Sequence, residues 1–315
     1  MSENATYFHN KLITWYLDNK RDLPWRHTTD PYRIWLSEII LQQTRVAQGL
    51  PYYQKFVEAY PTVQTLASAT EESVLKLWQG LGYYSRARNM LIASKFVANE
   101  LNGVFPDNYT DLKKLKGVGD YTASAIASIC YGEPAAVVDG NVYRVLSRVF
   151  GIDTPINSSE GIKEFKSLAQ VLIDSKRPGA YNQAVMEFGA RHCTPKNPAC
   201  STCIFKLKCE ALRTNRVSEL PVKLKKSKVR KRYFNYIVVQ SEDGRTLLQQ
   251  RHGKGIWQHL YEFPLVETQG IVSDNELQQS RSYETIVSQL TNDSETMLSS
   301  AVVQYNDVPI QHKLS

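Results

Sequence analysis

The feature that most constrains this chain of 315 residues is a basic segment that no hydrophobic core could accommodate. Residues 221–232, PVKLKKSKVRKR, contain seven lysines and arginines and no acidic residue. Charged side chains of this density stay at the surface, so the segment favours a link between two folded parts. The residues before it carry a net charge of +5 and those after it a net charge of −5. A chain of this length suggests two domains, and we expect a linker over 216–232.

The charge distribution also bears on partners. The first 232 residues carry a net charge of +12, which favours a polyanion partner there. Taken alone, such a basic run is more often a solvated linker, so a DNA partner has to be argued from motifs. The composition, 42% hydrophobic and 22% charged, excludes a mainly disordered, collagen-like or coiled-coil chain. No apolar run approaches the ~18 residues of a membrane span, and no signal peptide is evident at the N-terminus. We expect a soluble, cytoplasmic protein without a membrane partner.

Residues 7–213 have the periodicity of successive helices, interrupted by proline and glycine. Helices are expected over 32–49, 70–80, 85–102, 120–131 and 141–150. After the linker the pattern changes to β-rich runs. The runs 233–241 and 246–251 flank an Asp-Gly turn and predict a hairpin, and further strands are expected within 256–267 and 301–306, with a polar helix near 276–291. The chain is therefore expected to be mainly α, with a helical domain over 1–215 and a small α+β domain over 233–315.

The segment LKGVGDYTASAI, residues 115–126, predicts a tight turn that leads directly into a helix. Gly117 and Gly119 bracket the turn, and glycine allows the backbone to approach a ligand closely. N–H groups at the start of the following helix point outward and suit a phosphate. An ordinary connection between two helices remains an alternative. The apolar Leu115 and Val118, followed by small residues, favour a helix-hairpin-helix that grips the DNA backbone.

Glu38 lies in IWLSEIILQQT, residues 34–44. Three of its four helical neighbours at spacings of three and four are apolar, so its carboxyl group should be desolvated. Desolvation raises the pKa of a carboxyl group and lets it hold a proton near neutral pH. A buried glutamate paired with Arg26 or Arg45 is an equally good alternative on helix geometry alone.

Asp139 ends an apolar run and directly precedes a helix in AAVVDGNVYRVLSR, residues 135–148. An aspartate at this place is usually only an N-cap. A cap near the positive end of a helix also keeps its carboxylate ionised. One neutral carboxyl group and one charged carboxylate form the pair that cleaves glycosidic bonds. We therefore single out Glu38 and Asp139 as candidate catalytic residues.

Four of the five cysteines fall within residues 193–209, as Cys193, Cys200, Cys203 and Cys209. Clustered cysteines in an intracellular chain indicate metal ligation rather than disulfides. Four thiolates in one loop can hold a tetrahedral zinc ion or a [4Fe–4S] cluster, and zinc is the more common outcome. The fifth, Cys130, is expected to be a buried bystander in a helix.

Taken together and in this order, these motifs resemble the endonuclease III-like helix-hairpin-helix DNA glycosylase superfamily, and within it the MutY family of adenine DNA glycosylases. The resemblance covers nearly the whole chain and rests on LPWR (23–26), SEIILQQTRV (37–46), QGLGYYSRARN (79–89), the hairpin, VDGNVYRVLSR and the cysteine loop. It implies a two-lobed helical domain with a [4Fe–4S] cluster on the four cysteines, in place of zinc. It also implies a monomeric enzyme of base excision repair, associated with the nucleoid when on DNA.

The activity implied by the resemblance is release of adenine mispaired with 8-oxoguanine or guanine in duplex DNA. The adenine would be flipped out of the base stack into a pocket. Glu38 would protonate adenine N7 and Asp139 would stabilise the resulting oxocarbenium-like sugar, with Tyr121 and Asn141 hydrogen-bonded around it. The adenine pocket would be lined by Leu23, Trp25, Arg26, Val46 and Gln183. The residues inserted into the duplex would be Gln43, Thr44, Leu81 and Tyr83. For Leu23, Trp25, Val46 and Leu81, each taken singly, core packing is the simpler interpretation.

One position separates the relatives within the superfamily. The bifunctional endonuclease III-type enzymes carry a lysine shortly after the hairpin glycines, which forms a Schiff base and cleaves the strand. Here that position is Tyr121, and a phenol cannot form a Schiff base. The resemblance thus implies a glycosylase with little or no lyase activity. The competing hypotheses are a pyrimidine-damage glycosylase/lyase and a non-catalytic DNA-binding zinc protein.

The C-terminal part resembles the Nudix-like domain of the same family, which recognises 8-oxoguanine. IWQHLYEFP (256–264) fits a strand of that domain. The clustered glutamates of a Nudix hydrolase box are absent from the sequence, so we expect recognition without hydrolysis. The chain ends at QHKLS, where family members continue beyond Leu314 and Ser315 with the rest of a recognition loop. We therefore expect a partial, truncated domain over 233–315.

Overall fold

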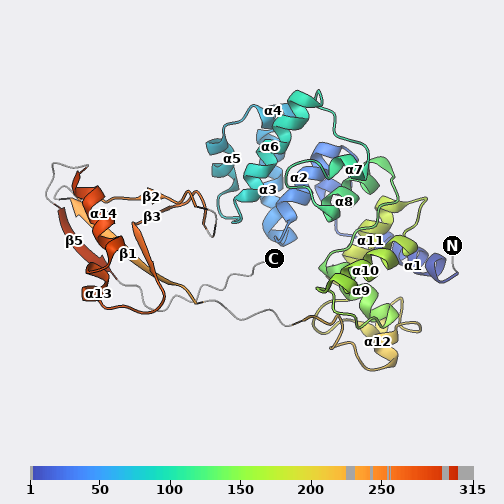
Figure 1. Ribbon diagram of the computed structural model, residues 1–315. Coiled ribbons are helices and arrows are strands. Elements are labelled where there is room, and N and C mark those ends of the chain that lie inside the picture. The colour runs from blue at the N-terminus through green and yellow to red at the C-terminus, as the bar shows by residue number, and fades with distance from the viewer. Residues whose placement is uncertain are drawn as a thin grey trace. The chain divides into compact units, whose positions relative to one another are not determined.

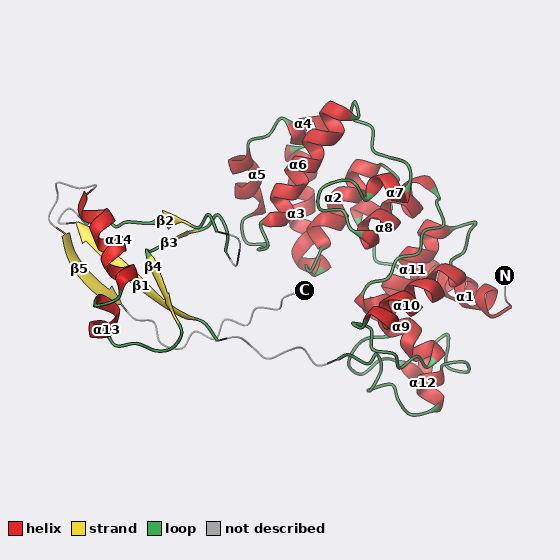
Figure 2. Ribbon diagram, viewed as in Figure 1, coloured by secondary structure: helices red, strands yellow, loops and turns green. Residues whose placement is uncertain are grey.

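The structure, a computed structural model, describes residues 3–224, 231–241, 244–253, 255, 257–292 and 298–303. The chain divides into two compact units, Met1–Lys225 and Lys226–Ser315. Figure 2 shows that, in the described part, the first unit is helical and the strands lie in the second. Within that same part, no helix is both long and apolar enough to cross a membrane.

The helical unit has two lobes, each with its own hydrophobic core (Figure 1). The first lobe contains α2 Pro31–Leu41, α3 Val46–Ala59, α4 Val63–Ala67, α5 Glu71–Trp78, α6 Ser85–Glu100 and α7 Tyr109–Leu112. The second lobe contains α1 Glu3–Asn19, α9 Gly140–Phe150, α10 Ser159–Leu172, α11 Pro178–Arg191 and α12 Glu210–Arg213. The N-terminal helix α1 packs against α11, so the two ends of the helical region share one lobe.

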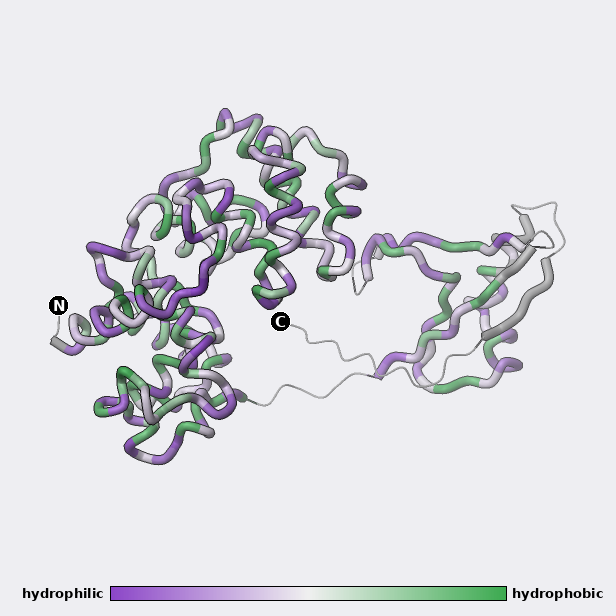
Figure 3. The backbone as a smooth tube through the Cα atoms, turned by 180° about the vertical axis from the view of Figure 1, so that it is seen from behind, coloured by the Kyte–Doolittle hydropathy of each residue, from purple (hydrophilic) through white to green (hydrophobic). Residues whose placement is uncertain are grey.

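Helix α8, Asp120–Tyr131, joins the lobes, since it packs against α2 on one side and α11 on the other. Its small side chains allow both contacts: Ala123 belongs to the core of the first lobe and Ala125 to that of the second. Along the helices of the unit, hydrophobic and hydrophilic residues alternate, as amphipathic helices require (Figure 3). The side chains that face the seam between the lobes therefore come from α2, α8 and the start of α9.

Most of the predicted helices are found where the sequence places them, with local caps that account for their ends. Thr70 caps α5 through the backbone N–H of Ser73, and Gly132, with a φ of +71°, ends α8. The prediction of one helix over 32–49 is wrong. The helix stops at Leu41, and α3 begins only at Val46. The cause is tertiary, because the intervening turn is stabilised by contacts from α6 that are described below.

The start of the predicted linker packs on the helical unit instead of leaving it. Leu220 is buried, and the carbonyl of Val222 accepts a hydrogen bond of 3.0 Å from the backbone N–H of Ile156. Residues 216–224 thus continue the second lobe. The following lysine-rich residues 225–230 lie outside the described residues.

The second unit contains a three-stranded antiparallel sheet of order β4-β1-β5 and a separate two-stranded ribbon β2-β3. The strands are β1 Tyr233–Ser241, β2 Gln249–Gln250, β3 Tyr261–Glu262, β4 Leu265–Thr268 and β5 Leu298–Val303. The register pairs Tyr236 with Leu265 of β4 and with Val303 of β5. Two short helices, α13 Asp274–Gln278 and α14 Arg281–Asn292, lie between β4 and β5 in sequence.

This arrangement confirms an α+β unit but corrects its predicted hairpin. The run 246–251 contributes β2, whose partner is β3, whereas β4 and β5 flank β1. Local turn chemistry indicated the hairpin, but long-range packing of Ile237, Val266 and Leu277 in the small core selects another pairing. Leu314 and Ser315 lie outside the described residues.

Candidate active site between the lobes

The two candidate carboxyl groups meet at Tyr121, at the seam between the lobes. Glu38 comes from the middle of α2, Tyr121 from the first turn of α8, and Asp139 from the N-cap of α9. The pKa of the Tyr121 hydroxyl is raised well above its usual value by burial and then by the negative charges of Glu38 and Asp139. This hydroxyl therefore lies within electrostatic reach of both carboxyl groups, and it also contacts Met186 Sδ at 3.0 Å. The sequence prediction that these residues share one site is supported by this geometry.

Glu38 is buried, with 8% of its surface exposed, among the apolar side chains of α2. Burial raises its pKa from 4.5 to about 7; a hydrogen bond with Tyr121 lowers it, and the charge of Asp139 raises it further. The alternative of an ion pair with Arg26 is wrong, since Arg26 is bound to Glu187. Arg45 is exposed, and as the N-cap residue of α3 it makes no capping hydrogen bond with its side chain. A protonated Glu38 is thus available near neutral pH.

Asp139 accepts three hydrogen bonds from the start of α9. The backbone N–H groups of Asn141 and Val142 donate to Oδ1 at 2.9 and 2.8 Å, and Asn141 Nδ2 donates to Oδ2 at 2.8 Å. We expected the cap to keep the pKa of Asp139 low. Instead burial raises this pKa, and the hydrogen bonds offset only part of the rise. The charge of Asp139 contributes to the raised pKa of Glu38, so the two carboxyl groups titrate as a coupled pair in which a charged Asp139 favours the protonated form of Glu38.

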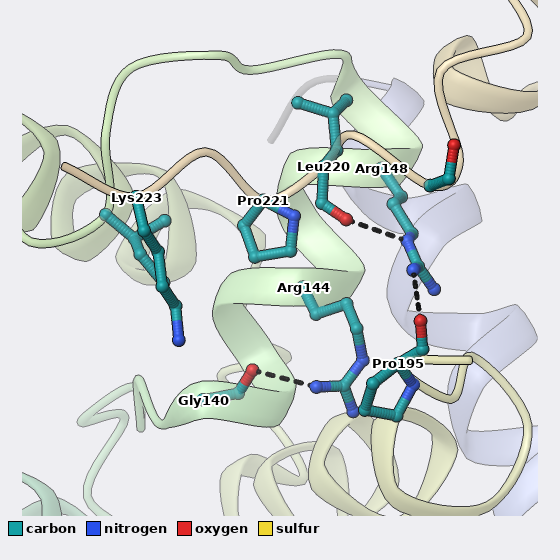
Figure 4. Close-up of a pocket in the computed structure, with 9 residues that line it drawn as sticks. Gly140, Arg144, Arg148, Pro195, Leu220, Pro221 and Lys223 are labelled. Carbon is teal, nitrogen blue, oxygen red and sulfur yellow. Dashed lines mark hydrogen bonds between the residues drawn. The ribbon is translucent and has the colours of Figure 1, made fainter. Parts of the chain in front are cut away.

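A chain of polar contacts behind Asp139 orients it. Asn141 Oδ1 accepts from Arg144 Nη2 at 2.9 Å, and the same guanidinium donates to the carbonyls of Gly189 at 2.6 Å and Cys193 at 2.7 Å. Figure 4 shows Arg144 reaching back to the carbonyl of Gly140, at the start of α9. Sequence reasoning missed Arg144, although its spacing of three residues from Asn141 on a helix was a usable signal.

The cysteine loop lies directly behind this chain of contacts. Arg148, one turn after Arg144, donates to the carbonyls of Leu220 at 3.1 Å and Pro195 at 3.3 Å (Figure 4). It also donates to the carbonyl of Thr194 at 2.8 Å. Its Nη1 also lies 3.5 Å from the Cys193 sulfur. Two arginines of α9 therefore tie the first cysteine of the loop to the helix whose N-cap is Asp139.

The four predicted ligand cysteines are free thiols that influence one another. Burial raises the pKa of Cys203 to about 11, and the charges of Cys193, Cys209 and Cys200 raise it too. Among the described residues, however, no three histidines, cysteines or carboxylates are grouped closely enough to hold one metal ion. Four thiolates of one loop suit either a tetrahedral zinc ion or a [4Fe–4S] cluster. Cys130 is half-buried and, mainly through burial, has a pKa raised to about 12, as suits an inert thiol.

Two of the residues predicted to line a base pocket, Arg26 and Gln183, lie near Glu187, which the sequence did not single out. Arg26 donates to Glu187 at 2.8 Å, and Arg21 to the same carboxylate at 2.6 Å. Burial raises the pKa of Glu187, but the hydrogen bonds of Arg21 and Arg26 more than offset this and lower it to about 2. Gln183, one turn before Glu187, accepts from the hydroxyl of Tyr16. Glu187 of α11 thereby fixes Arg26, and Tyr16 of α1 fixes Gln183.

The apolar members of the predicted pocket belong to the core of the first lobe. Leu23 and Trp25 are buried there, and Trp25 meets Tyr53 edge to face at 5.0 Å between ring centroids. Val46 is partly buried against the same core. Their packing is thus explained without a ligand, and a pocket role rests on the resemblance alone. Leu81, predicted to enter the duplex, is likewise buried in this core.

The predicted hairpin is present between α7 and α8. Gly117 has a φ of +81°, and a Cβ built on it would lie 2.9 Å from Asn89 Cβ, so only glycine fits this turn. Leu115 and Val118 are buried anchors, while Gly117 and Gly119 are exposed at the N-terminus of α8. The exposed turn with its free N–H groups is suited to a phosphate.

Comparison with known proteins agrees with this fold. A family profile described as "HhH-GPD superfamily base excision DNA repair protein" matches residues 36–170. A solved structure titled as that of a thermostable thymine-DNA glycosylase has a TM-score of 0.62 and 30% identity, covering 67% of this chain and 98% of that one. A non-covalent endonuclease III–DNA complex, at 22% identity, shares the fold with a TM-score of 0.58 over 68% of this chain and 97% of that one. The helical unit is therefore of the helix-hairpin-helix DNA glycosylase class.

Curated relatives narrow this class. The adenine DNA glycosylase of Homo sapiens is 46% identical over 66% of this chain and 40% of its own length. That of Buchnera aphidicola subsp. Baizongia pistaciae is 35% identical over 82% of this chain and 73% of its own length. The chain belongs to the adenine DNA glycosylase family. It spans 40% of the human relative and 48% of the Arabidopsis thaliana relative.

Proposed function

We propose that this chain is a monofunctional adenine DNA glycosylase of base excision repair, which hydrolyses the N-glycosidic bond of adenine mispaired with 8-oxoguanine or guanine in duplex DNA. The observation that carries the proposal is the pair of carboxyl groups around Tyr121, one with a pKa raised to about 7 and the other held by three N–H donors. This is the division between a neutral and a charged carboxyl group that glycoside cleavage requires. Family membership supports adenine as the base.

The proposed reaction begins with adenine flipped out of the stack. Glu38 donates its proton to adenine N7, so the protonated base accepts the electrons of the breaking bond between N9 and the sugar carbon and departs as neutral adenine. Asp139 lies at the face where the positive charge of the sugar develops, and Asn141 keeps its carboxylate oriented. The Glu38 carboxylate then takes a proton from the incoming water, whose oxygen bonds to the sugar, and Glu38 regains its protonated form.

We further propose that the reaction ends without strand cleavage. The position at which a lysine would form a Schiff base is occupied by Tyr121, whose hydroxyl contacts Met186 and lies beside both carboxyl groups. A phenol has no amine to condense with the sugar aldehyde. Borohydride reduction should therefore trap no stable protein–DNA adduct, and a trapped adduct would favour the glycosylase/lyase hypothesis instead.

The cysteine loop is proposed to hold a [4Fe–4S] cluster on Cys193, Cys200, Cys203 and Cys209. The charges of the other three cysteines act on Cys203, which supports one shared binding site for the four, and the family resemblance favours a cluster over zinc. When bound, such a cluster would cross-link the loop through four metal–thiolate bonds. Iron and sulfide analysis of anaerobically purified protein tests it: zinc without iron would support the alternative of a non-catalytic zinc protein.

For the second unit we propose recognition of 8-oxoguanine without hydrolysis, on the basis of the Nudix-like resemblance of its sequence. Cytoplasmic location with nucleoid association, and a monomeric state, remain parts of the same proposal. The decisive substrate test is base release from duplexes that carry adenine opposite 8-oxoguanine, guanine or thymine. A duplex with thymine opposite guanine belongs in the same series, because the relative of known structure with 30% identity is titled a thymine-DNA glycosylase.

A further inference from the structure

Two loops of the first lobe adopt an unusual backbone conformation at their tips. The first follows α2 and contains Gln43, with a φ of +55°; the second precedes α6 and contains Tyr83, with a φ of +49°. Left-handed backbone is unfavourable for a residue with a side chain, so other contacts must stabilise both tips. Gln43 and Tyr83 are exposed, so these constrained tips are presented to solvent. Strained backbone of this kind concentrates at functional sites.

One side chain, Arg86 of α6, contacts both loops at once. Its Nη1 donates to the carbonyls of Ile40 at 3.0 Å and Gln42, and to Thr44 Oγ1 at 3.2 Å. Its Nη2 lies 3.2 Å from the carbonyl of Gly82, within hydrogen-bond distance. The carbonyl acceptors on the first loop are those that helix α2 leaves without partners where it ends. Arg86 therefore takes the place of the helical turn that the sequence predicted there.

Aromatic rings enclose the guanidinium between the loops. Arg86 Cζ lies 5.0 Å from the ring centroid of Trp78 and 5.7 Å from that of Tyr83. Trp78 Nε1 donates to the carbonyl of Gly82 at 3.0 Å, which fixes the second loop from the other side. Arg86 is buried, with 8% exposure, and burial lowers its pKa to about 10, which leaves it charged at neutral pH. A buried cation is stable here because both loops direct carbonyl oxygens at it.

We propose that Arg86 is a positioning residue that holds the two loops as one rigid wedge, so that Gln43 and Tyr83 can enter a duplex together and hold an adenine outside the stack. The inference rests on the proposed function and adds to it the residue, Arg86, that keeps the two loops in a fixed arrangement. The side chain touches neither carboxyl group of the site, since the contacts of its two Nη atoms go to the loops. Its effect belongs to base extrusion and not to bond cleavage.

An arginine is required because the link between the two loops depends on the planar, forked arrangement of the guanidinium N–H groups. The guanidinium directs N–H groups to both sides in one plane and stacks on aromatic rings, whereas the ammonium of lysine is a compact charge without that geometry. Arg86→Lys should therefore keep the charge and lose the link between the loops. Arg86→Met removes both the positive charge and the link between the loops, while keeping a side chain of similar length.

The test separates extrusion from chemistry in the full chain. Single-turnover adenine release is measured on a duplex with adenine opposite guanine and on the same strand with that adenine unpaired in a bulge. For Arg86→Met we expect a loss of about 100-fold on the mispair and a much smaller loss on the bulge. Arg86→Lys should show the same selective loss, less strongly. The matched control is Arg88→Met on the same helix, whose partner is Glu71 at 2.8 Å and which should leave both rates unchanged.

If Arg86→Met has native circular dichroism and loses adenine release equally on both substrates, the proposed role of Arg86 in holding the two loops is wrong. If Arg86→Met does not fold, Arg86→Lys decides by the same ratio of rates. A second readout is independent of cleavage: 2-aminopurine in place of the target adenine should brighten on binding of the wild type and not of the Arg86 variants. Should the wild type release no adenine from any duplex, the proposed function fails, while this fluorescence comparison still supports or contradicts the proposed role of Arg86.

Discussion

The pH dependence of adenine release tests the role of Glu38, because its pKa of about 7 places the loss of its proton within the working range. With that value, about 90% of the enzyme carries the proton at pH 6 and about 10% at pH 8. A reaction that needs protonated Glu38 should thus slow by roughly tenfold between these two values and continue to fall tenfold per pH unit above them. At the acid end, the rate should fall where Asp139 becomes protonated.

The same rise in the pKa of Glu38 predicts a measurable contribution to the free energy of unfolding. A rise of the pKa from 4.5 to about 7 amounts to about 3 kcal/mol. Below pH 4.5 both the folded and the unfolded chain carry this proton, so burial of Glu38 has no ionic cost. Between pH 4.5 and 7 the unfolded chain loses the proton first, and the free energy of unfolding therefore falls as the pH rises. Glu38→Gln should remove this fall.

The assay is the second-order rate constant of adenine release from a guanine mispair, measured at single turnover between pH 5 and 9, with urea unfolding at the same pH values. Glu72→Gln, an exposed glutamate of α5, is the matched control and should follow the wild type in both measurements. A rate that stays level from pH 6 to 8 would refute the assignment of Glu38 as the proton donor. So would a difference in unfolding free energy between wild type and Glu38→Gln that does not change with pH.

Three further changes have expected outcomes. Arg144→Met removes the group that orients Asn141, and should slow release about 10-fold or more while DNA binding measured by anisotropy is unchanged. Glu187→Gln leaves Arg26 buried without its counter-charge, and should lower the free energy of unfolding by about 3–5 kcal/mol in urea titrations; since the pKa of Glu187 is depressed, the wild-type advantage should be full above pH 4.5 and vanish as the pH falls toward 2. Gly117→Ala forces a side chain into left-handed backbone, and should cost about 1–2 kcal/mol and weaken DNA binding. Unchanged values in any of these measurements would contradict the contact concerned.

The helical unit was largely predictable because its signals are local. Caps and glycines mark the ends of α5 and α8, and the position of Glu38 among apolar neighbours follows from helical periodicity. The end of α2 at Leu41 was not predictable in this way. It depends on Arg86, which is more than forty residues away in sequence and donates to the carbonyls at that end. A carbonyl acceptor carries no sequence signature.

The candidate site shows the same division. Glu38 and Asp139 were singled out from their places on helices, whereas Asn141 came from the family resemblance. Glu187 was missed because its partners Arg21 and Arg26 lie more than 160 residues away, and only the packing of α1 on α11 brings them together. The pKa of Asp139 was misjudged for a related reason: the cap predicts its hydrogen bonds, but burial at the seam is tertiary. In the second unit, the predicted hairpin between 233–241 and 246–251 was wrong, because the turn residues were its only evidence and β2 pairs with β3 instead.

The central claim, that two carboxyl groups of different protonation release a mispaired adenine, is tested most directly by base release from duplexes with adenine opposite 8-oxoguanine, guanine and thymine. Wild type and Glu72→Gln should release adenine from the first two and leave the third largely intact. Glu38→Gln and Asp139→Asn should each bind these duplexes and release no adenine above background. Near-normal release by either of these two variants, or preferential release of thymine opposite guanine by the wild type, would contradict the account.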